Sequence, residues 1–220
     1  PIFEPKGNTM SLVEFVTPLH NRSSRNYIER VTSHDKAECA TVAKQWSFDY
    51  WDGERHFGYG GYKYDGRWEA VAREMITRYN LKDDAKILDI GCGKGYLLYE
   101  FKKLLPNCSV QGLEISQYAI DHAKEEVRDN IIQGHAKELP FADNSFDLVI
   151  TNTTLHNLHL FDLFSAVKEI QRVKAGSAWI CVESYRNEAE KANLLYWQLT
   201  CEAFFNVQEW EWIFKECGYD

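Results

Sequence analysis

The sequence predicts an α/β fold, in which a doubly wound and mostly parallel β-sheet is flanked by helices. Residues 86–90 (KILDI) form a short apolar run that is typical of a buried parallel strand. Three glycines follow at once, at positions 91, 93 and 95, and a helical pattern begins directly after them. Further apolar runs then alternate with helical patterns, which is the order expected of a parallel sheet with crossover helices.

The expected elements can be placed in order along this part of the chain. Strands are expected at residues 86–90, 109–113, 130–134, 148–151 and 177–182. Helices are expected at residues 67–79, 96–105, 117–128, 161–173, 188–205 and 207–218. Ser116 stands immediately before one of these helices, and its hydroxyl is suited to accept from a free amide at the helix start.

The N-terminal part of the chain has a different character. We expect an N-terminal helical and Gly/aromatic lid segment at residues 1–65, followed by the main domain at residues 66–220. Prolines and a glycine break any long element within residues 1–25, and an irregular helical pattern extends to about residue 46. The sequence therefore predicts a helical cap attached to the sheet domain.

Residues 48–68 are rich in glycine and aromatic residues. They contain five glycines and nine aromatic rings, counting His56. A loop packed over the domain edge and a lid over a ligand both fit this composition. We favour the lid, because stiff rings between flexible glycines suit a loop that closes over a ligand.

The composition limits the possible partners. The formal net charge of −8 at pH 7 argues against a nucleic-acid partner, because phosphates require a basic surface. Six cysteines occur without a C-x-x-C pair, which favours free thiols in a reducing cytoplasm over disulfides. No apolar run approaches about 18 residues and no signal peptide opens the chain, so we expect a cytoplasmic protein that does not enter a membrane.

The glycine stretch is the first indication of a ligand site. Its spacing is G-x-G-x-G, which differs from the G-x-G-x-x-G of dinucleotide-binding folds, and Asp89 precedes Gly91 by two residues. Gly91 and Gly93 would let a ligand approach bare backbone amides. The Asp89 carboxylate would repel a pyrophosphate but suits a cationic ligand with hydroxyl groups. Glu114 ends the second strand, about 20 residues past the glycines, where an acid can bind both hydroxyls of a ribose.

Two stretches resemble the class I S-adenosylmethionine (SAM) methyltransferases. Asp89 and the glycines after it are similar to motif I of that family. Residues 134–149 (GHAKELPFADNSFDLV) are similar to the family pattern G-D-A-x-x-L-P-F-x-D-x-S-F-D-L-V. The resemblance covers residues 66–218. It implies a Rossmann-like fold, with SAM as cofactor and S-adenosylhomocysteine (SAH) as product.

The resemblance also assigns cofactor-binding residues. They are Tyr64, Arg67, Asp89, Gly91, Gly93, Glu114, Ile115, His135, Ala136 and Asn152. Arg67 stands where small-molecule N-methyltransferases of the glycine and guanidinoacetate type carry an Arg that binds the methionine carboxylate, although a surface Arg is the alternative. His135 departs from the family, which usually has an Asp that accepts from the adenine amino group. His135 could stack on or bond to the purine, with the Ala136 amide reaching a ring nitrogen.

The segment after the fourth strand supplies candidates for the chemistry. In doubly wound sheets ligands bind at the carboxyl ends of the strands, which places His156 and Asn157 near the transferred methyl group. His156 is the candidate general base, and a packing or capping histidine is the alternative that stays open. Asn157, Tyr59 and Tyr62 are candidate contacts of the acceptor. No metal is expected, because His156 and His159 have no third ligand in view.

The end of the chain differs from the family pattern. There the last helix normally leads into two final strands, whereas here residues 207–218 are followed only by two more residues. We therefore expect the last strands to be missing, through truncation or because the sheet edge is unusual.

The resemblance implies direct displacement of the SAM methyl group by a nitrogen or oxygen nucleophile of a small-molecule acceptor. The acidic chain slightly favours a cationic or neutral acceptor. A non-catalytic module that binds SAM or a partner also fits, given His135 and the missing strands. A nicotinamide-dependent oxidoreductase would share Glu114 and the glycine turn but is disfavoured by the glycine spacing and by Asp89. The oligomeric state is left open.

Overall fold

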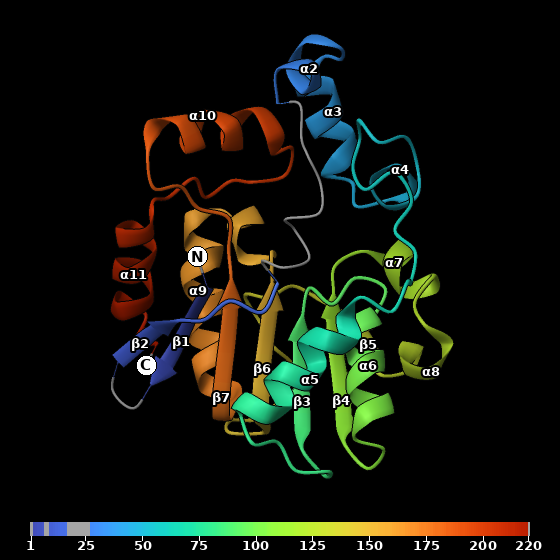
Figure 1. The fold of residues 1–220 in the computed structure, drawn as a ribbon, viewed down its shortest axis with the longest axis vertical. Helices are drawn as coiled ribbons and strands as arrows, with labels where there is room; N and C mark the ends of the chain where they lie inside the picture. Colours follow the sequence, from blue (N-terminus) through green and yellow to red (C-terminus); the bar gives the residue numbers. More distant parts are fainter. Residues whose placement is uncertain (1, 7–8, 17–26, 220) are drawn as a thin grey trace.

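The computed structural model describes residues 2–6, 9–16 and 27–219. Among these residues seven strands form one sheet in the order β2-β1-β7-β6-β3-β4-β5 (Figure 1). The five parallel strands are β3 (Lys86–Ile90), β4 (Ser109–Glu114), β5 (Ile131–Gln133), β6 (Phe146–Asn152) and β7 (Lys174–Cys181). β3 lies between β4 and β6, so the order reverses beside it, as the doubly wound prediction requires.

Helices cover both faces of this sheet. They are α5 (Trp68–Arg78), α6 (Tyr96–Leu104), α7 (Gln117–Asp121), α8 (Glu125–Arg128), α9 (Leu160–Val173) and α11 (Val207–Glu216). Because side chains alternate along a strand, Ile87 packs with α5 and α6, while Leu88 and Ile90 pack with α9 and α11. The predicted Rossmann-like α/β fold is confirmed.

One edge of the sheet is built from the N-terminal part of the chain. Strand β1 (Ile2–Lys6) pairs antiparallel with β7 and with β2 (Thr9–Leu12). The sequence analysis expected no long element here. In the described part of the chain only helices follow β7, and β1 and β2 occupy the edge of the sheet beside it.

Two predicted helices are shorter than expected. The helix expected at residues 117–128 is divided into α7 and α8, because the Lys124 amide between them donates to the Lys94 carbonyl at 3.0 Å. The Ser116 hydroxyl caps α7 as predicted, accepting from the Ala119 amide at 3.0 Å. Tertiary hydrogen bonds therefore override the helical pattern at this point.

The helix α10 (Glu188–Trp197) ends well before residue 205, where it was expected to end. The amides of Glu202 and Ala203 instead donate to the His156 carbonyl, at 2.9 and 3.0 Å. Residues 198–206 are thus tied to the segment after β6 and contain no helix.

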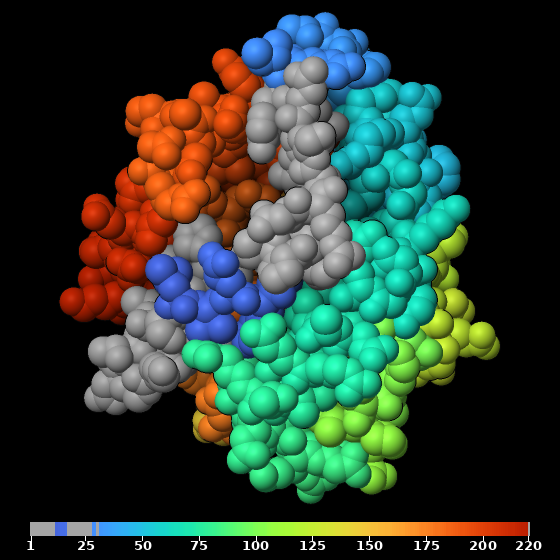
Figure 2. Space-filling model, in the orientation of Figure 1, coloured from blue at the N-terminus to red at the C-terminus, as the bar shows by residue number. Residues whose placement is uncertain are grey.

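The N-terminal cap and α10 lie at the same end of the molecule. The cap contains α2 (Tyr27–Thr32), α3 (Lys36–Ala43) and the short α4 (Phe48–Trp51). Figure 1 shows these helices and α10 beyond the carboxyl ends of the parallel strands. Figure 2 shows the blue cap and the orange α10 region at that end. No helix of the described residues is long and apolar enough to cross a membrane.

Candidate functional site

A cavity of about 210 Å³ opens at the carboxyl ends of the parallel strands, and we call it the main cavity. Eight of the predicted site residues line it: Tyr59, Gly91, Glu114, Ile115, His135, Ala136, Asn152 and Asn157. They come from the last residues of β4 and β6, from the segments that follow the parallel strands and from the aromatic segment. The fold thus brings together most of the residues chosen from the sequence.

Glu114 is held by the backbone on both of its oxygens. Its Oε2 accepts from the Gly93 amide at 2.8 Å, and its Oε1 accepts from the Ser116 amide at 2.8 Å. Burial raises the pKa of Glu114, while these amides act in the opposite direction. Each carboxylate oxygen has a second lone pair, so Glu114 can still accept from hydroxyl groups of a ligand in the main cavity.

Two buried oxygens near the glycine loop lack a partner among the described residues. They are Oδ1 of Asp89 and Oδ1 of Asn152. Asn152 lines the main cavity, whereas Asp89 is only 4% exposed and does not. Burial and the nearby Glu114 raise the pKa of Asp89 to about 7. The unpaired Asn152 oxygen and the carboxyl groups of Asp89 and Glu114 together suit a ligand that brings hydrogen-bond donors and positive charge.

The two glycines named as cofactor contacts have different neighbours. Gly91 has a φ of 75°, and a Cβ there would lie 2.1 Å from Oγ1 of Thr154. Gly93 has a φ of 55°, and a Cβ there would lie 3.0 Å from the Trp51 ring. The Gly93 amide is already bound to Glu114, and Gly93 does not line the main cavity. The lack of a side chain at Gly93 therefore makes room for the Trp51 ring and not for a ligand in the main cavity.

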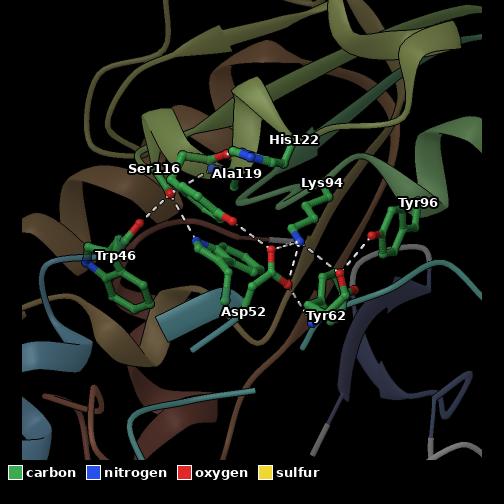
Figure 3. A network of polar contacts seen from close by, with 10 residues as sticks. Trp46, Asp52, Tyr62, Lys94, Tyr96, Ser116, Ala119 and His122 are labelled. Carbon is green, nitrogen blue, oxygen red and sulfur yellow. Dashed lines mark hydrogen bonds and ion pairs between the residues drawn. The ribbon is translucent and has the colours of Figure 1, made fainter. Parts of the chain in front are cut away.

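Residues 46–62 pack against the glycine loop, and we call them the aromatic lid after the function expected for residues 48–68. Trp51 is 6% exposed, and its Nε1 donates to the Ser116 hydroxyl at 2.9 Å. The same hydroxyl bonds to the Trp46 carbonyl (Figure 3). The Trp51 ring also stacks on Tyr59, with centroids 5.4 Å apart. Trp46, Tyr50 and Trp51 form the lid side of the main cavity.

A polar network fastens this lid. We call it the lid clamp: Asp52, Tyr62, Lys94, Tyr96 and Tyr118. The Lys94 ammonium donates to the Asp52 carboxylate, at 2.6 Å for Oδ2, and to the Tyr62 carbonyl at 2.9 Å. The Tyr118 hydroxyl donates to Asp52 at 2.9 Å. The Tyr96 hydroxyl donates to the Tyr62 carbonyl at 2.8 Å (Figure 3). Burial alone would raise the pKa of Asp52, but the hydrogen bonds from Lys94 and Tyr118 outweigh burial and lower it.

His135 lines the main cavity together with Glu114. Its Nδ1 accepts from the Lys137 amide at 3.2 Å, and its Nε2 lies 3.7 Å from a carboxylate oxygen of Asp162. Burial and the Lys137 charge lower the pKa of His135. A largely neutral ring beside Ala136 and Ile115 can pack against a flat, uncharged group.

Tyr64 and Arg67 do not line the main cavity. The Tyr64 hydroxyl donates to Oε1 of Glu100 at 2.6 Å, which raises the pKa of Tyr64 to about 12. The Arg67 Nε donates to Oδ2 of Asp65 at 2.7 Å, and more than half of the Arg67 side chain is exposed. Both side chains thus have partners outside the main cavity.

His156 lines a second cavity, of about 170 Å³. His156 is 2% exposed, and burial lowers its pKa to about 4. Its Nδ1 accepts from the Glu183 amide at 3.3 Å. The ring is therefore neutral near pH 7 and its Nδ1 is engaged. The described residues contain no cluster of three side chains that could hold a metal ion.

The sequence analysis did not identify several residues of the site. Lys94 and Asp52 were not chosen, although a lysine between two glycines and an aspartate after Trp51 are visible in the sequence. Thr153 and Thr154 line the main cavity directly after Asn152 and could have been found from the strand end. The pairing of Asp52 with Lys94 joins residues 42 positions apart and has no local signal.

Comparisons with known proteins identify the main domain. Residues 81–218 match the family described as "Methyltransferase domain". An uncharacterized methyltransferase of Schizosaccharomyces pombe is 35% identical over 48% of this chain and 41% of its own length. A demethylmenaquinone methyltransferase of Symbiobacterium thermophilum is 32% identical over 54% of this chain and 50% of its own length. A sterol 24-C-methyltransferase of Gibberella zeae is 26% identical over 83% of this chain and 53% of its own length. The chain thus spans about half the length of these relatives.

Solved structures share the fold at low identity. The YcgJ protein of Bacillus subtilis has a TM-score of 0.55 at 22% identity, over 66% of each chain. The [4+2]-cyclase SpnF has a TM-score of 0.55 at 20% identity, over 71% of this chain and 61% of its own. One neighbour is named as a cyclase, so the shared fold does not by itself define the reaction.

Proposed function

The chain belongs to the methyltransferase-domain family, and we propose that it transfers the methyl group of SAM to a nitrogen or oxygen nucleophile of a small-molecule acceptor. The cofactor of this family is SAM and the product formed from it is SAH. The acceptor, its nucleophilic atom and the residues that bind it are the parts that we propose.

The observation that carries this proposal is the position of Glu114. Its carboxylate borders the main cavity beside Gly91, with both oxygens oriented by backbone amides. We assign Glu114 to the two ribose hydroxyls, since a carboxylate accepts from both. We assign Asn152, whose Oδ1 has no partner in the described chain, to the amino group of the methionine part. His135, Ala136 and Ile115 would then surround the purine.

The methionine carboxylate needs a cation or free amides. Arg67 is our candidate, and it would reach the carboxylate only after leaving Asp65, which now holds it. Tyr64 is bound to Glu100 in the same way. Asp89 would act without contact, because a bound cationic ligand would favour its charged form and the charged form would in turn favour the ligand.

When bound, SAM supplies an electrophilic methyl group. The chain's own contribution would be to align the nucleophile with the methyl–sulfur bond and to exclude water beneath the aromatic lid. Tyr59, Tyr62 and Asn157 are our candidates for the acceptor contacts. His156 is our candidate base, and it would be a weak one because burial lowers its pKa to about 4.

The names of two relatives support a small-molecule acceptor. One is a demethylmenaquinone methyltransferase and the other a sterol 24-C-methyltransferase. Both names refer to small organic acceptors and not to a protein or a nucleic acid.

The direct test is incubation with SAM that carries an isotopically labelled methyl group, together with a library of small nucleophiles. We expect SAH and a methyl-labelled product in equal amounts. A protein that binds SAM but forms neither with any acceptor would instead be a binding module. A new product without SAH would indicate a reaction other than methyl transfer.

A further inference from the structure

We propose that the second cavity is the acceptor pocket and that it recognises a small polar amine through the carboxylate of Glu183. This inference rests on the proposed methyl transfer and adds the chemical class of the acceptor. Glu183 was not among the residues chosen from the sequence, although it directly follows the apolar stretch that ends β7.

The two cavities are neighbours. Tyr50, Tyr59, Thr153 and Asn157 line both of them. A group bound in the second cavity can therefore meet a group bound in the main cavity at these four residues. The methyl group transferred in the proposed reaction would lie at this junction, within reach of a group bound in the second cavity.

The second cavity has a polar lining. Its polar side chains are Tyr50, Arg55, Tyr59, Thr153, His156, Asn157, Glu183, Gln198 and Thr200. Leu199 and Trp197 are its main apolar side chains. A sterol or a prenylated quinone would leave many of these polar groups without partners, which is costly in a partly closed site. The lining therefore favours a polar acceptor.

Most polar groups around Glu183 already have partners within the chain. The Thr200 hydroxyl donates to Oδ1 of Asn157 at 2.8 Å, and Nδ2 of Asn157 donates to the Thr153 carbonyl at 3.3 Å. The Arg55 guanidinium lies over the Trp197 ring, 5.2 Å from its centroid. By contrast, the Glu183 carboxylate makes no hydrogen bond or ion pair with any described residue.

The backbone of Glu183 is fixed on both sides. Its amide donates to His156, and its carbonyl accepts from Nε1 of the fully buried Trp210 at 3.1 Å. A carboxylate on so rigid a base is preorganised to bind donors from a ligand. His156 is neutral, so it does not neutralise the charge of Glu183.

A protonated amine satisfies this arrangement better than an alcohol. An ammonium–carboxylate hydrogen bond is charge-assisted and roughly twice as strong as a neutral one. The rings of Tyr50 and Tyr59 also line this cavity and can attract a cation. The acceptor class that fits best is therefore a small polar amine.

The chemistry balances with Glu183, in place of the weakly basic His156, as the proton acceptor. The carboxylate takes one proton from the bound ammonium, which leaves a neutral amine with a free lone pair. That lone pair forms the new nitrogen–carbon bond, while the electrons of the methyl–sulfur bond stay on sulfur and give SAH. The methylated product leaves as an ammonium ion, and the proton on Glu183 passes to water.

The test compares three sets of probes with the wild-type protein and SAM. The amines are methylamine, ethanolamine and glucosamine, the matched alcohols are methanol, ethylene glycol and glucose, and the apolar probe is a short-chain demethylmenaquinone. SAH formation is the readout. We expect SAH with at least one amine and none with its matched alcohol. SAH with only the alcohols or the quinone would overturn the amine assignment but leave methyl transfer standing. A protein that binds SAM and forms no SAH with any of the probes would overturn the amine assignment and count against methyl transfer as well.

The variant Glu183→Gln keeps the shape of the side chain and removes its charge. We expect kcat/KM for the amine to fall by about 100-fold or more, while Kd for SAM changes by less than about twofold. The matched control Glu188→Gln, at an exposed position near the start of α10, should retain wild-type values of both. Wild-type amine turnover in Glu183→Gln would overturn the proposal, whereas loss of SAM binding by the wild type would instead remove the proposed function.

Discussion

Oδ2 of Asp52 lies 2.6 Å from Nζ of Lys94, so an ion pair joins the aromatic lid to the loop between the second and third glycines. The Lys94 side chain is 5% exposed and that of Asp52 is 22% exposed. An ion pair that is largely buried stabilises a protein only when its geometry is good enough to offset the loss of hydration. The lid clamp therefore fixes how the aromatic lid lies against the glycine loop.

Replacing Asp52 by Asn should weaken the fold and loosen the lid, because the buried Lys94 ammonium loses its carboxylate. We expect the free energy of unfolding, measured with urea, to fall by about 1–3 kcal/mol, since Asp52 is partly exposed. The dissociation of SAM should also become faster. The control Arg186→Gln breaks a pair at an exposed position, and we expect little change from it. Equal free energies of unfolding for Asp52→Asn and Arg186→Gln would show that the Asp52–Lys94 pair does not stabilise the fold.

Replacing Glu114 by Ala should weaken SAM binding by about 1–3 kcal/mol, because the ribose hydroxyls lose their acceptor. Calorimetric titration gives this difference. The variant Glu114→Gln keeps one oxygen acceptor for the backbone amides and should fall between the wild type and Glu114→Ala. A folded Glu114→Ala protein with wild-type affinity would contradict the ribose assignment.

Replacing Gly93 by Val should displace the lid, since a side chain at a φ of 55° is strained and meets the Trp51 ring. Tryptophan fluorescence and SAM affinity should both change. The control is Gly61→Ala, at a φ of 102° with no atom within 4 Å of the added carbon. Gly61→Ala therefore adds backbone strain without a steric clash, and it separates the two effects that Gly93→Val combines. A wild-type spectrum and affinity in Gly93→Val would show that the lid does not pack as described.

Asp89 should make the apo protein less stable as the pH rises. Its pKa is about 7 in the folded protein, above the ordinary value of 3.8, so between these values the folded state holds a proton that the unfolded state has lost. Stability from this group is therefore complete at low pH and is lost as the pH passes through about 7. Asp89→Asn should flatten this part of the profile of unfolding free energy. An unchanged profile would show that Asp89 is charged at neutral pH.

Replacing His156 by Gln should lower turnover without changing SAM affinity. Gln keeps an acceptor near the Glu183 amide, which His156 Nδ1 now serves, so the fold should persist. The comparison of kcat with Kd for SAM separates the two effects. Turnover equal to that of the wild type would limit His156 to packing.

The elements with local signals were predictable from the sequence. β3 and the glycine turn follow from an apolar run and three glycines, and Glu114 and Asn152 follow from their places at strand ends. These signals depend on neighbours in the sequence. The family match over residues 81–218 covers the same part of the chain.

The features that were not predictable depend on distant partners. Strand β1 pairs with β7, so that residues near position 3 lie beside residues near position 180. No local sequence pattern predicts this pairing. The early end of α10 depends on amides that bond to the His156 carbonyl. Arg67 was chosen for its position before β3, but its partner is Asp65, an acid two residues away that competes with any ligand.

The central claim is that the main cavity binds SAM through Glu114. The most direct measurement is calorimetric titration of the protein with SAM, with SAH and with NADH as the control. The account predicts binding of SAM and SAH, weakened in Glu114→Ala, and no binding of NADH. Binding of NADH alone, or no binding of SAM and SAH by the folded protein, would contradict it.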